Sequence, residues 1–154
     1  MEGNNIEIVD VNEDIYEKVL AFLGEVKTLN IEEEIVKNAS VIMDLDEVVG
    51  AISYEKFGYY GLIRYFIFKK YVDDDIIENL FLHLEKKASK DEIRYLFSIV
   101  MDKDVMDLFD NLSFIKSEII LIDLYIDSSE PLLYACIKLY KLIYYIYKKP
   151  IQIV

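Results

Sequence analysis

The sequence predicts an α+β fold in which a mixed β-sheet is flanked by helices. Stretches with a hydrophobic period of two residues alternate along the chain with stretches of period 3.6, which are typical of strands and amphipathic helices. The chain has 154 residues, of which 54% are hydrophobic and 30% are charged, so it is suited to a globular core. It contains 5 glycines and 2 prolines and shows no flexible linker.

The first elements are a strand and two helices. Residues 6–11 alternate between hydrophobic and polar types and predict a strand. Residues 12–26 follow with an apolar helical face and an asparagine as the N-cap. A shorter helix is predicted within 30–39, where Asn30 and Glu33 have capping-box spacing.

Three strands are predicted next, over 40–45, 47–57 and 59–68. These segments are rich in Val, Ile, Tyr and Phe, and short turn sequences separate them. They therefore predict two hairpins in an antiparallel meander.

A helix and a strand then form a crossover unit. Hydrophobic residues return at helical spacing over 76–88, and Asp75 with Glu78 predicts a helix start capped by its own side chains. A nonpolar strand follows over 92–100, so the unit at 62–100 predicts a right-handed parallel crossover. Further along the chain, a short helix is predicted over 102–112 and a long strand over 114–126.

The last predicted helix, over 129–149, is apolar on nearly every side apart from one stripe of lysines and a tyrosine. Such a helix needs cover on most of its faces. We therefore divide the chain into a domain over 1–127 and a C-terminal extension over 128–154. Three roles for this helix stay open: packing on the sheet, forming a homodimer or partner interface, or lying on a membrane surface, which the acidic body disfavours.

Charge and composition exclude several classes of protein. The net charge of −12 argues against a nucleic-acid partner, because phosphate binding needs a basic surface. After Glu130 the chain has four lysines and no acidic residue, so this region has the opposite charge. The single cysteine cannot form an internal disulfide. No secretory signal or long uncharged apolar run is apparent, which predicts a cytoplasmic protein.

Four stretches carry a resemblance to a known family. "EVVGAISYE" looks like the third strand of that family, and "YFIFKKYV" looks like its fourth strand and the exit from it. "IENLFLHLEKKA" is similar to the helix that follows. "VMDKDVMDLFDNLSF" looks like the exit from the fifth strand and the next helix. In this order and spacing, the chain resembles the GNAT superfamily of acyl-CoA-dependent N-acetyltransferases over about residues 6–126. The resemblance implies a splayed pair of central strands that receives acetyl-CoA. The helix over 129–149 lies outside it.

The resemblance also implies a set of cofactor positions. The cofactor arm would pair with backbone between the fourth and fifth strands, and its pyrophosphate would bind N–H groups at the start of the next helix. By position these sites fall on Ile67, Phe68, Val72, Asp73, Asp74, Asp75, Ile76, Ile77 and Asp102.

The predicted phosphate loop departs from the family pattern. Asp75 and Ile77 replace glycines, and Val72 stands where a basic residue is usual. Side chains crowd the approach to the backbone, and carboxylates repel a phosphate. One like-charge contact at ~4 Å costs roughly 4 kcal/mol at an effective dielectric of ~20, whereas micromolar binding amounts to about 8 kcal/mol. We therefore expect little or no acetyl-CoA binding.

The catalytic positions are sparse. Phe109 stands where the resemblance places a tyrosine that protonates the leaving thiolate, and phenylalanine cannot donate a proton. Glu55 is a candidate general base by its strand location, although a solvated strand residue is the alternative. His83 is the only histidine and is predicted to lie on the surface. No metal site is predicted, since the aspartates near the helix start lack the spacing of a calcium loop.

Three functions remain open from the sequence. The first is a divergent GNAT-like protein that has lost or weakened acetyl-CoA binding and has a binding or structural role. The second is an active N-acetyltransferase with an atypical cofactor loop that acts on an amine. The third is an unrelated α+β interaction module.

Overall fold

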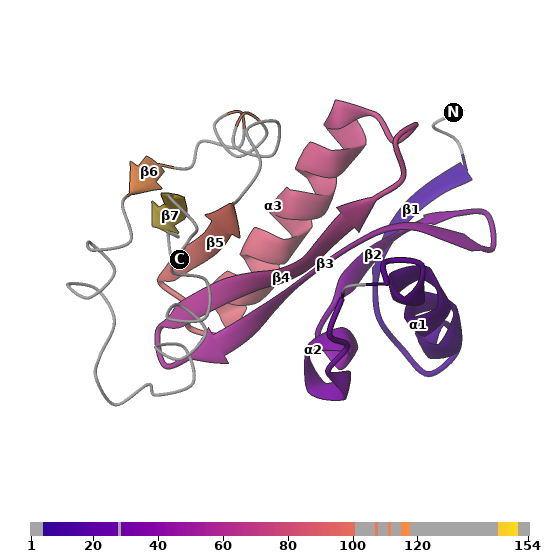
Figure 1. Ribbon diagram of the computed structural model, residues 1–154, viewed down its shortest axis with the longest axis horizontal. Helices are drawn as coiled ribbons and strands as arrows, with labels where there is room; N and C mark the ends of the chain where they lie inside the picture. The colour runs from indigo at the N-terminus through magenta and orange to yellow at the C-terminus, as the bar shows by residue number, and fades with distance from the viewer. Residues whose placement is uncertain are drawn as a thin grey trace. The chain divides into compact units, whose positions relative to one another are not determined.

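The computed structural model describes residues 5–27, 29–100, 107, 111, 115–117 and 145–150 (Figure 1). The strands that it describes are hydrogen-bonded in the order β1-β2-β3-β4-β5-β7-β6. Along the chain, the elements are β1 (Ile6–Asp10), α1 (Tyr16–Gly24), α2 (Glu33–Lys37), β2 (Ser40–Asp44), β3 (Glu47–Phe57), β4 (Tyr60–Phe68), α3 (Asp74–Lys90), β5 (Tyr95–Val100), β6 (Ile115–Ser117) and β7 (Tyr145–Pro150).

The chain divides into two compact units. The first comprises Met1–Glu55 and Arg64–Lys87, and the second comprises Lys56–Ile63 and Ala88–Val154. The predicted boundary between residues 127 and 128 lies outside the described residues, so it stays a prediction.

The strand pairings confirm the predicted α+β arrangement with a mixed sheet. β1 pairs antiparallel with β2, and β2 pairs antiparallel with β3. β4 pairs parallel with β5, with Tyr60 opposite Tyr95 and Leu62 opposite Phe97. The helix α3 connects these parallel strands, so the crossover predicted at 62–100 is confirmed as parallel.

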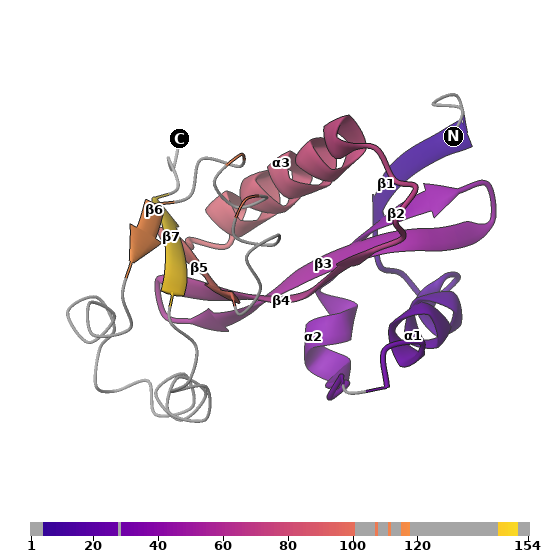
Figure 2. The same cartoon turned by 45° about the horizontal axis from the view of Figure 1, so that its top comes forward.

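In the first unit, helices cover both faces of the sheet. α1 and α2 lie on one face, and α3 lies on the other (Figure 2). Hydrophobic residues of α1 and α2 pack on side chains of β2 to β4, which alternate between the two faces of each strand. This core contains Val19, Phe22, Leu23, Ile35, Val36, Val41, Met43, Val48, Ala51 and Tyr65.

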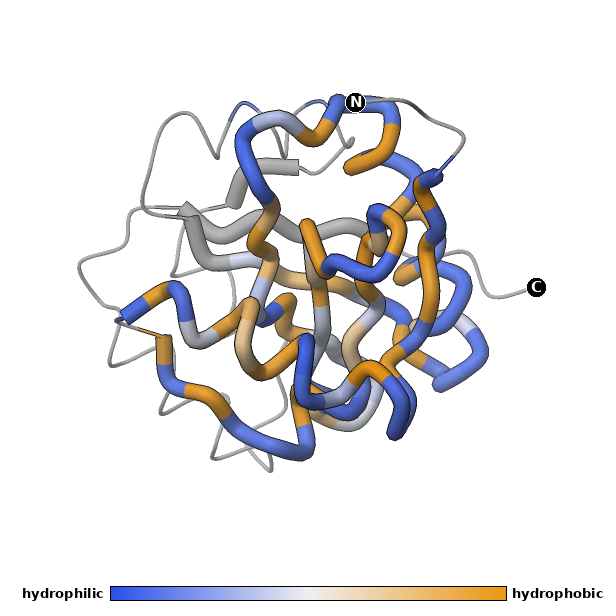
Figure 3. The backbone as a smooth tube through the Cα atoms, turned by 90° about the vertical axis from the view of Figure 1, so that its right-hand side faces the viewer, coloured by the Kyte–Doolittle hydropathy of each residue, from blue (hydrophilic) through white to orange (hydrophobic). Residues whose placement is uncertain are grey.

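The face that carries α3 has a second set of apolar contacts. Phe66 of β4 stacks on Phe81 of α3 with ring centroids 6.5 Å apart, and Phe68 lies edge-on to Phe66 at 5.7 Å. Coloured by hydropathy, the strands carry the hydrophobic stretches and the turns are mainly hydrophilic (Figure 3). The apolar periodicity of α3 thus reflects its contact with the sheet.

Asp10, at the end of β1, is a polar junction between three elements. Its Oδ1 accepts hydrogen bonds from Ser40 Oγ at 2.8 Å and pairs with His83 Nε2 at 2.9 Å. Lys87 Nζ lies 3.5 Å from the same oxygen. His83 is therefore partly buried against β1, and the predicted surface position is only partly right. Because Ser40 is fully buried, the junction satisfies a hydroxyl that has no access to water.

The second unit has its own aromatic contacts. Tyr60 stacks on Tyr95 with centroids 5.8 Å apart and lies 5.7 Å from Phe97. The guanidinium of Arg94 lies 4.1 Å from the ring centroid of Tyr59, which is a cation–π distance. These contacts reinforce the parallel pairing of β4 with β5.

The predicted C-terminal helix is wrong over its last residues. Tyr145–Pro150 forms β7, which pairs antiparallel with β5 and places Lys149 opposite Leu96. A short run of aromatic and β-branched residues fits either period, and pairing with a distant strand decides between them. Residues 129–144 of the predicted helix lie outside the described residues.

Two predicted helix starts also differ in detail. α1 begins at Tyr16, and Asn12 Oδ1 accepts the N–H groups of Asp14 at 2.9 Å and Ile15 at 3.2 Å in the preceding turn. α2 has Glu32 as its N-cap, without a side-chain cap, so the predicted capping box of Asn30 and Glu33 is absent.

The Asp10 junction predicts a pH-dependent stability. Burial raises the pKa of Asp10, but hydrogen bonds with His83 and Ser40 and the charge of Lys87 bring this pKa below its ordinary value. The unfolded chain then binds more protons, so the contribution is present above about pH 4 and is lost as the pH falls through the lower folded pKa.

We therefore expect Asp10→Asn to lower the free energy of unfolding by about 1 kcal/mol near neutral pH. The difference from the wild type should shrink toward zero at about pH 2. Urea unfolding across this range measures it, with Glu7→Gln as the control on the same strand. A difference that persists unchanged in acid would contradict the assignment.

A second prediction concerns close packing at Gly50 of β3. A Cβ at this position would lie 2.7 Å from Cδ1 of Ile42, which is fully buried, and 3.4 Å from Cβ of Phe68. Gly50→Ala should therefore lower the free energy of unfolding by about 1–3 kcal/mol. Ile42→Val removes the clashing carbon, so the double variant should be more stable than the sum of the single effects predicts. Additive effects in thermal unfolding would argue against this contact.

Candidate functional site

The loop between β4 and α3 is the predicted phosphate site. The N–H of Lys69 donates to the Val49 carbonyl at 2.9 Å, and the N–H of Val72 donates to the Lys69 carbonyl at 3.0 Å. The side chain of Val72 is buried. The loop is thus a tight turn anchored to β3, and Val72 fills space beneath it.

The first turn of α3 uses part of its hydrogen-bonding capacity internally. The carbonyl of Asp73 accepts the N–H groups of Ile76 at 3.0 Å and Ile77 at 3.1 Å. The helix therefore begins at Asp74, and the predicted cap at Asp75 is wrong because Asp75 lies inside the first turn. The N–H groups of Asp74 and Asp75 have no acceptor within the helix, as is usual at a helix start.

Negative charge surrounds this helix start. Asp73, Asp74 and Asp75 are all exposed. Desolvation, and after it the charges of Glu47 and Asp44, raises the pKa of the neighbouring Tyr71 hydroxyl. The Nζ of Lys69 lies 3.6 Å from a carboxylate oxygen of Glu47, so its charge is shared with an acidic neighbour. These features oppose the approach of a phosphate.

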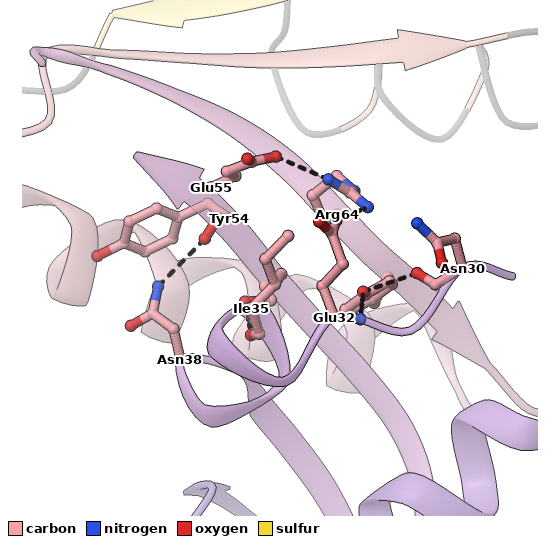
Figure 4. A network of polar contacts seen from close by, with 9 residues as sticks. Asn30, Glu32, Ile35, Asn38, Tyr54, Glu55 and Arg64 are labelled. Atoms are coloured by element: carbon pink, nitrogen blue, oxygen red, sulfur yellow. Dashed lines mark hydrogen bonds and ion pairs between the residues drawn. The ribbon is translucent and has the colours of Figure 1, made fainter. Parts of the chain in front are cut away.

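A second polar cluster joins β3, β4 and the segment before α2 (Figure 4). Arg64 Nη1 donates to Glu55 Oε1 at 2.7 Å, and Arg64 Nη2 donates to Glu32 Oε2 at 2.8 Å. The guanidinium lies between the two carboxylates, and Glu55 and Arg64 are both mostly shielded from solvent. Glu55 is consequently an ion-paired residue rather than a solvated one.

Tyr65 ties the same segment to β4. Its hydroxyl accepts the N–H of Glu32 at 2.6 Å and donates to the carbonyl of Asn30 at 2.8 Å. The backbone of Tyr65 has a φ of 56°, which is rare for a residue other than glycine. This left-handed conformation interrupts the regular alternation of β4.

The pKa values of this cluster follow from its contacts. Burial disfavours the charge of Arg64, but the hydrogen bond to Glu32 and the charge of Glu55 outweigh it and raise the Arg64 pKa. Burial raises the pKa of the Tyr65 hydroxyl. Arg64 is therefore a permanent cation, and Tyr65 is a neutral donor at physiological pH.

Two neighbouring contacts fix α2 on the sheet. The buried Oγ of Ser53 donates to the carbonyl of Ile35 at 2.7 Å, and Asn38 Nδ2 donates to the carbonyl of Tyr54 at 3.2 Å. Ser53 of β3 thereby satisfies the backbone carbonyl of Ile35 in α2, and the Tyr54 carbonyl of β3 satisfies the side-chain amide of Asn38, just after α2.

Comparisons with solved structures identify this arrangement. The chain is similar to N-acetylglutamate synthase from Neisseria gonorrhoeae complexed with coenzyme A and L-arginine, at 15% identity and a TM-score of 0.72 over 96% of this chain. It is also similar to a GNAT-family acetyltransferase from Staphylococcus aureus Mu50, at 14% identity and a TM-score of 0.66, with 96% and 99% of the two chains covered. An acetyltransferase from Streptococcus agalactiae 2603 matches at 13% identity and 0.63, with the same coverage.

The chain has the GNAT fold. This confirms the predicted GNAT-like α+β fold, and the alternative of an unrelated α+β module is wrong. The match covers 33% of the N-acetylglutamate synthase chain, so this chain spans about a third of that protein's length. Neither the models of known protein families nor the sequences of curated proteins give a match.

The GNAT fold brings only some of the predicted site residues together. Val72, Asp73, Asp74, Asp75, Ile76 and Ile77 form the loop and the first turn of α3, and Ile67 and Phe68 form the end of β4 that leads into it. Asp102 and Phe109, the predicted cofactor contact and the replacement for the acid, lie outside the described residues. The predicted cofactor roles of all these residues stay predictions.

Sequence reasoning missed the roles of Arg64 and Glu32. An alternating strand pattern places Arg64 and Tyr65 on opposite faces, and nothing in the sequence signals the positive φ that lets both reach Glu32. Among the described residues, no group of three or more His, Cys, Asp or Glu side chains is arranged to hold a metal ion. The same residues contain no helix long and apolar enough to cross a membrane.

Proposed function

We propose that this chain is a GNAT-fold protein in which acyl-CoA binding is lost or weak and whose role is binding or structural. The observation that supports it most strongly is the row of three exposed aspartates at the start of α3. In the GNAT fold, this helix start is the position that the resemblance assigns to the cofactor pyrophosphate.

Electrostatics supports the loss of binding. A phosphate bound at this helix start would lie beside the negative charges of Asp73, Asp74 and Asp75, where binding requires a positive potential. The nearby Lys69 is already paired with Glu47. Lys70 is the one exposed cation within the described loop that has no ion pair there. One cation cannot offset three carboxylates, even when solvent screens each interaction.

We also propose the C-terminal region, 128–154, as the interaction surface, for a second copy of this chain or another protein. The proposal rests on composition, since this region has four lysines and no acidic residue beyond Glu130 while the rest of the chain is strongly acidic. Tyrosine, which is abundant there, is enriched at the cores of interfaces.

A second function, N-acyl transfer to an amine, is supported by one observation. The N–H groups of Asp74 and Asp75 have no acceptor within α3, so two backbone donors remain at the helix start for an anion. An acyl-CoA held there would be bound by backbone groups rather than by a basic side chain.

Calorimetric titration with acetyl-CoA and with CoA separates the two functions. We expect no saturable binding at ligand concentrations up to about 100 μM, because repulsion at the helix start removes much of the ~8 kcal/mol that micromolar affinity requires. A dissociation constant of tens of micromolar or tighter would overturn the proposal and favour N-acyl transfer.

A charge-removal variant tests the cause. Asp73→Asn, Asp74→Asn and Asp75→Asn together keep the side-chain volume and remove three charges, so CoA binding should strengthen at least tenfold and weaken again with added salt. The matched control, Glu7→Gln with Glu13→Gln and Glu17→Gln, changes the net charge equally at exposed positions outside the loop. An equal gain in the control would show that general charge, rather than the loop, limits binding.

A further inference from the structure

A cavity of about 510 Å³ lies between the start of α1 and α2, which cover the same face of the sheet (Figure 2). This volume is in the range of sites for small molecules. The lining residues come from the turn after β1 and from both helices, and all of them belong to the first unit. None comes from β4, β5 or the loop before α3. The cavity is therefore separate from the positions that the resemblance assigns to the cofactor.

Two of the lining residues give the cavity an apolar wall. Val11 and Tyr16 are both partly buried and pack against the hydrophobic core of α1, α2 and the sheet. Among the described contacts, the hydroxyl of Tyr16 has no hydrogen-bond partner. An aromatic face attracts a cation, and an apolar wall binds an alkyl chain.

Charged residues form most of the remaining wall. Glu13, Glu17 and Glu33 are exposed and stand with a single Lys37, which gives the cavity a net charge of −2. Desolvation, and after it the charge of Glu33, raises the pKa of the Tyr16 hydroxyl, whereas the charge of Lys37 lowers it. Carboxylates beside an apolar and aromatic wall match a cation that carries an alkyl chain.

Lys37 is the cation that the chain itself supplies to this cavity. Its Nζ lies 3.1 Å from Oε1 of Glu33, one helical turn earlier, and both side chains are exposed. Ion pairs with this spacing and exposure are weak, because water screens them. A ligand cation can therefore take the place of Lys37 at Glu33 without breaking a strong contact.

The same protein already holds an organic cation among residues of these kinds. The guanidinium of Arg64 lies between the carboxylates of Glu32 and Glu55, 5.3 Å from the centroid of the Tyr65 ring. Carboxylates and a tyrosine ring are thus a sufficient environment for such a group in this chain.

We propose that the cavity between α1 and α2 binds an organic cation with a short apolar stem, in competition with Lys37. Glu17 and Glu33 attract the charged head, and Tyr16 and Val11 contact the stem. The site is independent of the proposed loss of acyl-CoA binding, because no residue of the loop before α3 lines it.

NMR titration with n-butylammonium chloride tests the site. We expect saturable shifts of the backbone N–H signals of Glu13, Tyr16 and Lys37, with a dissociation constant on the order of 1–10 mM, as suits a ligand with few non-hydrogen atoms. n-Butanol, which is neutral, and sodium chloride at the same concentration should give no saturable shifts. Saturation with either control, or none with n-butylammonium up to about 100 mM, would overturn the proposal.

Single charge changes test the competition with Lys37. Lys37→Met removes the competing cation and should tighten n-butylammonium binding about threefold, whereas Glu17→Gln should weaken it about threefold. The matched controls Lys27→Met and Glu7→Gln change the same charges at exposed positions outside the cavity and should leave the affinity unchanged. Equal effects in the variants and their controls would show a general charge effect and overturn the assignment, as would an unchanged affinity in Lys37→Met and Glu17→Gln.

Discussion

The left-handed backbone of Tyr65 is the constraint on which the described site depends. Such a conformation costs an L-residue roughly 1–2 kcal/mol. The hydroxyl accepts one hydrogen bond and donates another, which offset this cost at about 1 kcal/mol each, and burial of the ring contributes further. The contacts with the segment before α2 therefore contribute to the observed conformation. The backbone of β4 and the position of this segment therefore stabilise each other.

β4 connects a region in which a cation is paired with carboxylates to a region in which carboxylates are exposed. At its middle, Arg64 places one cation between the carboxylates of Glu32 and Glu55, and Arg64 and Glu55 are mostly shielded from solvent. Beyond its end, Asp73 to Asp75 are exposed, and Lys70 is the exposed lysine of the described loop for which no ion pair is described. Cations are thus used where they fix the fold and are scarce where the GNAT fold would need them for a phosphate. The described charges are therefore placed in a way that suits ion pairing within the fold better than binding of a phosphate.

Hydrophobic periodicity predicted the meander, α3 and β5, because the hydrophobic residues of each of these elements follow either the strand period or the helix period, and not both. It failed at Tyr145–Pro150, where pairing with β5 overrides a helical pattern, and at the starts of α2 and α3, where backbone geometry sets the first residue. Glu55 was found as a candidate by its strand position. Its partner Arg64 was not, since the positive φ at Tyr65 arises from contacts 33 and 35 residues away in sequence.

The loop residues also show how stabilisation of a helix start competes with the binding of an external anion. The N-terminal end of a helix carries a partial positive charge, and a carboxylate in the first turn stabilises the helix by about 0.3–1 kcal/mol. Asp74 and Asp75 therefore stabilise α3 at the position where the GNAT fold would receive a pyrophosphate. The partial positive charge of the helix end can stabilise either the aspartates of the helix or an external anion, and the presence of one weakens the stabilisation of the other. Aspartates that stabilise α3 in this way support the crossover between β4 and β5, and the same charges oppose a phosphate at this helix end.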